Sequence, residues 1–220
     1  MPLSRRSFLA VLGAAAAQRA TAQDSPSIDS REFVTPATDA AIHAGLDWLA
    51  GRQHPGGAFA PELSFNRYRL NPAVNALCGM ALLSSGSTPG RGPYGAHLDR
   101  VIDLLLGFAM PSGFIAEPNA NYDEQPMYGH GFATLFLAEV SGMTPRPEVP
   151  TALPGAVQLI IGTQNSEGGW RYAPEPRDAD ISVTVCELMA LRGAHNAGIA
   201  VPKATIEQAV AYILRCQNPD

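Results

Sequence analysis

The sequence predicts an all-α fold of helical hairpins that repeat about every 55 residues. Three observations support this prediction. A short pattern, an apolar helix that stops at glycine followed by an aromatic residue, recurs along the chain. Each period also contains two segments with helical periodicity, and a glycine ends the second of them. The pattern is anchored at Gln53, Ala109, Gln164 and Gln217, which lie 56, 55 and 53 residues apart.

The first residues are typical of an export signal rather than of the repeats. Arg5 and Arg6 precede an apolar run at 10–17 and a small-x-small triplet at 20–22. The run of about ten residues is too short to span a bilayer, and the paired arginines indicate the twin-arginine pathway. The alternative is an arginine-tipped amphipathic helix. We expect a signal at 1–22, export to the periplasm or cell envelope, a flexible lead-in at 23–37, and repeats at 38–220.

The charge balance and the cysteines exclude several classes of function. The chain has 15 basic and 20 acidic side chains, and loss of the signal would leave twelve against twenty. Such an acidic chain, with Lys203 as its single lysine, is not expected to bind nucleic acid. No later stretch is long enough to span a membrane. Three well-separated cysteines predict no disulfide framework, and no motif predicts a cofactor.

The helix before each anchor carries an apolar stripe. Its apolar residues recur at i, i+3, i+4, i+7 and i+8, which places them on one side of an α-helix. They are Leu98, Val101, Ile102, Leu105 and Leu106 in the second period, and Ile206, Ala209, Val210, Ile213 and Leu214 in the fourth. One apolar side indicates helices of an outer layer.

The helix after each turn is more uniformly apolar. A helix that is apolar on most sides is buried on most sides, so these helices are expected to form an inner layer. Cys78, Thr134 and Cys186 are predicted to occupy equivalent places in it. The segments run from Val74 to Leu82, from Phe132 to Val140 and from Val183 to Leu191, and end near Gly86, Gly142 and Gly198.

The turn between the two helices has a structural rationale. Gly168 and Gly169 can adopt positive φ and end the outer helix without a Cβ clash. Trp170 can then fold back onto the hairpin. The amide of Gln164 can satisfy nearby helix-end groups. An architectural role is therefore predicted for the recurrent glutamines and for Trp170.

The turn pattern resembles the glutamine–tryptophan repeat of squalene and oxidosqualene cyclases, which has a looser form in the β subunits of protein prenyltransferases. The resemblance covers 38–220 and is most specific from Gln164 to Val185. It implies an α/α toroid with a ligand cavity lined by the inner helices. Because the chain supplies about three and a half hairpins, we expect an incomplete toroid. Its apolar edge would require further chain, a partner or self-association.

Two carboxylates directly precede the third inner helix. In bacterial squalene cyclases an Asp-x-Asp-Asp motif protonates the substrate alkene, and in prenyltransferase β subunits an Asp-x-Cys pair binds zinc. Asp178 and Asp180 match part of each motif, but Ile181 replaces the third acid and Asp180 replaces the thiolate. The resemblance implies that Asp180 is a proton donor or a ligand; since no third ligand can be named, no metal is predicted. Alternatively, Asp180 or Ser182 caps the helix.

The start of the second inner helix supplies the rest of the candidate site. Glycines on both sides of His130 would let its ring reach a cavity and relay a proton; the alternative is a histidine hydrogen-bonded at a helix start. Aligned periods put Tyr128 level with Asp180 and His130 level with Ser182. Aromatic faces can stabilise carbocations, although core packing explains these rings equally well. The predicted catalytic residues are Asp178, Asp180 and His130, and the predicted substrate-binding residues are Tyr128, Trp170, Tyr172 and Phe132.

Three functions are compatible with these features. The first is a cyclase- or prenyltransferase-like enzyme that acts on an isoprenoid or other long hydrocarbon. The second is a non-catalytic toroid that binds lipid, peptide or protein at the cell envelope. The third is a secreted polysaccharide hydrolase or lyase, for which Asp178 and Asp180 form the only carboxylate pair. Export favours a membrane-partitioning hydrocarbon over a cytoplasmic prenyl diphosphate as the ligand.

Overall fold

The computed structural model describes residues 34–59, 70–117 and 125–218. The predicted signal and residues 23–33 of the predicted lead-in lie outside this description. The described residues form helices and no strands, as the predicted all-α fold requires, and none of these helices is long and apolar enough to cross a membrane. The helices are α2 (Pro36–Ala50), α3 (Pro72–Leu83), α4 (Gly95–Gly107), α5 (Pro126–Val140), α6 (Glu148–Gly162), α7 (Ile181–Asn196) and α8 (Lys203–Arg215).

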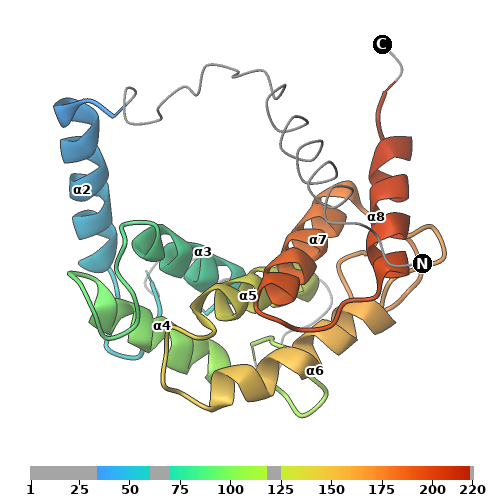
Figure 1. The fold of residues 1–220 in the computed structure, drawn as a ribbon, viewed down its shortest axis with the longest axis horizontal. Coiled ribbons are helices and arrows are strands. Elements are labelled where there is room, and N and C mark those ends of the chain that lie inside the picture. Colours follow the sequence, from blue (N-terminus) through green and yellow to red (C-terminus); the bar gives the residue numbers. More distant parts are fainter. Residues whose placement is uncertain (1–33, 60–69, 118–124, 219–220) are drawn as a thin grey trace, which may run out of the picture. The chain divides into compact units, whose positions relative to one another are not determined.

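Within residues 44–220, which form one compact unit, the helices lie in two layers. The unit before it is described only at 34–43, the first part of α2. α3, α5 and α7 pack side by side in one layer (Figure 1). α4 packs against α3, α6 packs against both α5 and α7, and α8 packs against α7. The second helix of each predicted period therefore belongs to one layer and the first helix to the other.

Burial follows the apolar patterns of α4 and α5, whereas apolar side chains of α3 and α7 are exposed at Val74, Leu77, Val185 and Met189. α5 is buried along most of its length, and the predicted stripe of α4 is buried at Leu98, Val101, Ile102 and Leu105. The stripe of α8 is buried only in part, because Val210 and Leu214 are exposed. The helices of the α3–α5–α7 layer start at strong signals: Asn71 caps α3, Asp180 caps α7, and prolines open α3 and α5.

Three turns share one backbone design. Gly57, Gly113 and Gly168 have φ of 93°, 87° and 93°, a region that favours glycine. A Cβ at each would lie 2.3 Å from a backbone oxygen of the next outer helix, at Arg100, Gly155 and Gln208 respectively. Positive φ was also predicted for Gly169, but its φ is not positive. Gly169 is instead required by close packing, since a Cβ there would lie 2.6 Å from the Ala179 Cβ.

The recurrent glutamines join each turn to the next outer helix, as their predicted architectural role requires. Gln53 donates through Nε2 to the carbonyls of Gly57 and His97, both at 3.0 Å. Gln164 donates in the same way to Gly168 and Thr205, both at 2.9 Å. Ala109 has no side chain that can do this, so the middle turn lacks the link.

A repeated hydrogen bond defines the register between the turns and the α3–α5–α7 layer. The backbone N–H of Phe59, Ile115 and Trp170 donates to the side chain of Asn75, His130 and Thr184 respectively. Ile115 thus corresponds to Trp170. The donor and acceptor are separated by 16, 15 and 14 residues in the three repeats.

The predicted equivalence of Cys78, Thr134 and Cys186 is wrong in this register. Cys186 lies two positions after Thr184 and therefore corresponds to Leu77 and Phe132. The distance between the turn and the helix shortens by one residue in each successive repeat, and the predicted equivalence does not follow these steps.

Candidate functional site

Asp180 lies at the start of α7, next to the start of α5. One carboxylate oxygen, Oδ1, accepts hydrogen bonds from the backbone N–H groups of Ser182 and Val183 at 2.9 and 3.2 Å. Asp180 is therefore the N-cap of α7, which was one of its two predicted roles. Its own N–H donates to the carbonyl of Trp170 at 2.8 Å, which fixes the cap to the preceding turn.

Two hydroxyl groups donate to the Asp180 carboxylate, and a third is linked to it through Ser182. Ser182 Oγ donates to Oδ1 at 2.5 Å, and Tyr172 Oη donates to Oδ2 at 3.3 Å. Tyr128 Oη is 2.5 Å from Ser182 Oγ, and because the serine proton is directed to Asp180, the tyrosine is the donor. We call Tyr128, Tyr172, Asp180 and Ser182 the tyrosine–aspartate cluster. It brings together α5, α7 and the loop between α6 and α7.

These contacts hold Asp180 in its charged form. The hydrogen bond from the Ser182 hydroxyl lowers the pKa of the Asp180 carboxyl, and the two backbone N–H groups act in the same direction. The negative charge of Asp180 in turn raises the pKa of the Tyr172 phenol. At neutral pH the cluster therefore contains a carboxylate, which accepts hydrogen bonds or protons, and a Tyr172 phenol that remains protonated.

Asp178 lies outside this cluster. Its carboxylate forms a largely exposed ion pair with Arg171, with a distance of 3.4 Å between Arg171 Nε and Asp178 Oδ2. The Arg171 guanidinium also lies 4.6 Å from the centre of the Tyr172 ring. In the part of the chain that the structure describes, no group of three or more histidine, cysteine or acidic side chains could hold a metal ion.

His130 and Trp170 point into the core. His130 is fully buried: Nδ1 accepts from the Ile115 N–H, and Nε2 donates to the Ala156 carbonyl, both at 3.1 Å. Burial lowers the pKa of the imidazole to about 4, so it is neutral. Trp170 donates through its indole N–H to the Ile160 carbonyl at 2.7 Å. The structure therefore does not bring His130 together with Asp180.

The glycines beside His130 serve helix packing. A Cβ on Gly129 would lie 3.2 Å from Pro72, and one on Gly131 would lie 2.8 Å from the Cys186 Sγ. They let α3 and α7 approach α5 closely, and they do not free the imidazole ring to reach a cavity.

Apolar side chains extend the cluster over α5 and α3. Leu77 and Phe132 lie two positions after Asn75 and His130, about 200° around the helix from side chains that point at the turns. Phe132 is half-buried and 46% of Leu77 is exposed. The rings of Tyr128 and Tyr172 lie 6.1 Å apart at 31°. Four apolar or aromatic side chains thus share one surface with a carboxylate.

No protein-family model matches this sequence, and no curated protein gives a significant match.

Glu187 is a buried acidic residue that was not among the predicted site residues. Its side chain is fully buried in α7, and neither carboxylate oxygen has a hydrogen-bond partner in the described structure. One oxygen would lie 3.0 Å from a Cβ on Gly131, so the carboxyl packs against the backbone of α5. Burial raises its pKa well above the ordinary value. The available signal was an acidic residue inside the apolar segment Val183 to Leu191.

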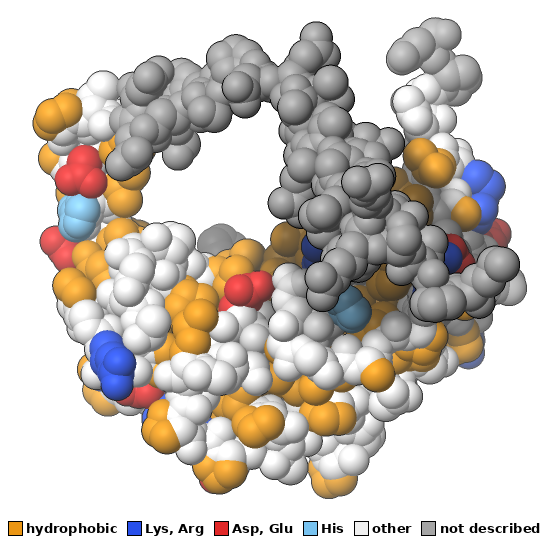
Figure 2. Space-filling model, in the orientation of Figure 1, with side chains coloured by type: hydrophobic (Ala, Val, Ile, Leu, Met, Phe, Trp, Pro, Cys, Tyr) orange, Lys and Arg blue, Asp and Glu red, His pale blue; other side chains and the backbone are white. Residues whose placement is uncertain are grey.

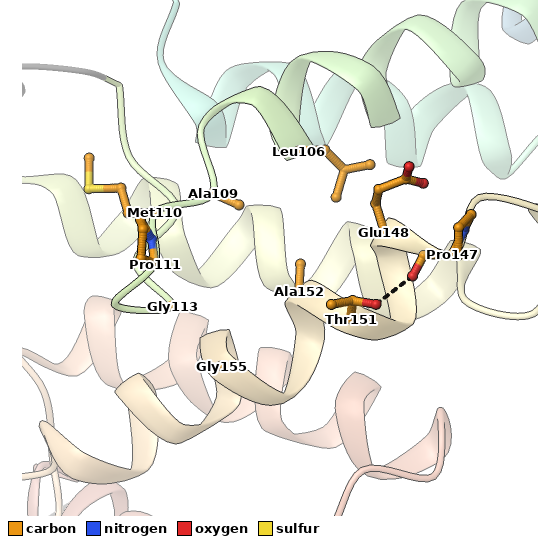
Figure 3. Close-up of a pocket in the computed structure, with 10 residues that line it drawn as sticks. All are labelled: Leu106, Ala109, Met110, Pro111, Gly113, Pro147, Glu148, Thr151, Ala152 and Gly155. Carbon is orange, nitrogen blue, oxygen red and sulfur yellow. Dashed lines mark hydrogen bonds between the residues drawn. The ribbon is translucent and has the colours of Figure 1, made fainter.

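A cavity of about 550 Å³ lies at the middle turn, between the end of α4 and α6. Figure 3 shows Ala109 and Gly113 of the turn opposite Ala152 and Gly155 of α6. In the other two turns a glutamine replaces Ala109 and donates to the corresponding helix. The absent glutamine side chain accounts for part of this space, so the cavity alone does not indicate a ligand.

Proposed function

We propose that this chain is an exported repeat protein of the squalene cyclase and prenyltransferase kind that binds a long hydrocarbon, such as an isoprenoid. The ligand lies along Leu77, Phe132, Tyr128 and Tyr172, the surface of the α3–α5–α7 layer that faces away from the turns. In this proposal the hairpins belong to an α/α toroid whose inner layer contains this surface. The twin-arginine-like signal supports export, which would bring the protein to membrane-borne hydrocarbons.

The observation that carries the proposal is that exposed Leu77 and half-buried Phe132, Tyr128 and Tyr172 include the aromatic partners of the Asp180 site. Burial of such side chains against a hydrocarbon is worth about 25 cal/mol per Å² of apolar area. The carboxylate and its hydroxyl partners can bind a hydroxyl group at one end of the ligand. Contiguous apolar surface of this kind often marks a binding site.

The charged state of Asp180 favours binding over proton-initiated cyclisation. An acid that protonates an alkene must carry its proton at the working pH, whereas hydrogen bonds lower the pKa of Asp180. We therefore place Asp180, Tyr128, Tyr172 and Phe132 in ligand binding. His130 and Trp170 position the helices around them.

Equilibrium binding of labelled farnesol tests this function. We expect saturable binding that Leu77→Asp weakens about tenfold or more, since a charge in an apolar contact must be desolvated. Met143→Asp is the matched control, because Met143 is equally exposed at 46% but lies in the loop after α5. Equal binding by both variants, or none by the parent, contradicts the proposal.

A second measurement separates binding from catalysis. Asp180→Asn retains an oxygen that can cap α7 but removes the charge. We expect the parent chain to release squalene unchanged, and Asp180→Asn to bind farnesol more weakly than the parent while remaining folded. Turnover of squalene that is lost in Asp180→Asn would instead identify an enzyme.

A further inference from the structure

The α7 helix leaves large apolar side chains exposed on one side. In the register set by the turn hydrogen bonds, Gly131 and Leu135 are one and five positions after His130 on α5, and both contact α7. The corresponding residues of α7 are Val185 and Met189. They are 41% and 48% exposed. The positions through which α5 contacts α7 are therefore exposed in α7 itself.

The α8 helix also exposes an apolar side chain at a position that is buried in the preceding outer helix. Gly113 and Gly168 meet equivalent points of the next outer helices, at Gly155 of α6 and Gln208 of α8. Val157 and Val210 each lie two positions after these points. Val157 is completely buried in the core between α6 and the α5–α7 pair, whereas 43% of Val210 is exposed. Val210 is therefore an uncovered apolar side chain on α8.

A groove of about 530 Å³ lies between α7 and α8, and we call it the α7–α8 groove. In Figure 2, hydrophobic, basic and acidic side chains lie next to one another around α8. The groove contains no acidic side chain. Its lining residues are Leu188, Met189, Leu191, Arg192, His195, Val201, Lys203, Ile206 and Val210.

The basic side chains define the charge that an occupant needs. Lys203 pairs with Glu207 at 2.7 Å, whereas Arg192 and His195 make no side-chain hydrogen bond or ion pair with the described residues. Both lie in the last turns of α7. The contact between α5 and α7 has an acidic residue at the same height along α7. There, Glu139 of α5 lies against α7, with its Oε1 3.7 Å from a Cβ on Gly193. A parallel helix in the groove would bring a carboxylate at this position towards Arg192.

We propose that the α7–α8 groove binds an amphipathic helix of a partner polypeptide, parallel to α7, with the chemistry of α5. Its apolar and small residues cover Val185, Met189 and Val210, and an acidic residue in its last turn pairs with Arg192. The established α5–α7 contact is continued by one further helix of the same kind. This is a helix-in-groove interaction, in which apolar side chains at helical spacing supply the affinity.

A peptide of residues 125–140, the α5 sequence with blocked ends and a fluorophore, is a suitable probe. We expect saturable binding to the full chain by fluorescence anisotropy. Met189→Asp should weaken binding about tenfold or more, because a few buried side chains supply most of the affinity of such an interface. Met143→Asp should leave binding unchanged. Circular dichroism checks that both variants remain folded, as the exposure of both side chains predicts.

A charge exchange locates the peptide in the groove. Arg192→Glu should weaken binding of the parent peptide, and Glu139→Lys in the peptide should restore it. Absence of peptide binding overturns the proposal. It is also overturned if Met189→Asp leaves the affinity unchanged, or if Glu139→Lys in the peptide fails to restore binding to Arg192→Glu. Self-association of the chain that Met189→Asp abolishes, without peptide binding, would identify a second copy as the occupant. Saturable binding of dodecanoate in place of the peptide would identify an anionic amphiphile.

Discussion

At the scale of single residues, Glu187 is an acidic group without a compensating partner. Its carboxyl is enclosed by α5 and α7, and both oxygens lack hydrogen bonds within the described residues. An ionised carboxylate in such a place would cost several kcal/mol of desolvation, so burial favours the protonated form of this group in the folded chain. The neighbouring Cys186 thiol is also buried, which raises its pKa. Neither group can supply a compensating positive charge.

The raised pKa of Glu187 predicts that stability decreases as the pH rises. This contribution is present in full below the ordinary pKa of 4.5. Above it the unfolded chain releases the proton while the folded chain retains it, so the free energy of unfolding falls by up to about 1.4 kcal/mol per pH unit. The fall continues until the pH passes the folded-state pKa. Glu187→Gln should remove this slope, which urea unfolding at a series of pH values measures; equal slopes in both proteins would contradict the assignment.

At the scale of elements, the middle turn differs from its two neighbours by one side chain. Ala109→Gln would place an amide opposite the Gly113 carbonyl and the first turns of α6, as Gln53 and Gln164 do in their repeats. Two hydrogen bonds contribute about 1 kcal/mol each, and ordering the side chain costs up to about 2 kcal/mol. We expect a net gain between zero and about 2 kcal/mol, and each kcal/mol raises the Tm of a domain of this size by about 2–4 °C.

Ala109→Leu is the control for that variant. It fills space at the turn but offers no donor, so a smaller change in Tm than with Ala109→Gln is expected. The reverse change, Gln164→Leu, should lower the free energy of unfolding by about 1–3 kcal/mol, because two carbonyls lose their donor. If Leu and Gln at position 109 behave alike, packing rather than hydrogen bonding distinguishes the turns.

At the scale of the whole molecule, the sequence predicts those features that short-range turn and helix patterns determine. The period, the two helices per repeat and the roles of Gln164 and Gly168 follow from turn chemistry that tolerates few residues. The register of Cys78 could not be predicted, because it depends on a loop length that differs in each repeat. The direction of the His130 ring could not be predicted either, since flanking glycines are compatible with a mobile side chain or with close helix packing.

The joints between repeats give a last prediction about the whole molecule. Gly113 and Gly86 both have φ of 87°, but a Cβ on Gly113 would lie 2.3 Å from the Gly155 oxygen, whereas one on Gly86 would meet nothing within 4 Å. Alanine at either place costs about 1–2 kcal/mol for its backbone conformation. Only Gly113→Ala must also push α6 away from the turn, which costs about 1–3 kcal/mol more.

In a repeat protein each unit is held mainly by its neighbours. A displaced α6 should therefore loosen α7 and α8 while leaving α3 and α4 protected. Hydrogen exchange measures this directly: Gly113→Ala should accelerate exchange from α6 to α8, and Gly86→Ala should not. If both variants lower protection evenly over all helices, the chain unfolds as one cooperative unit and the glycine joints do not divide it.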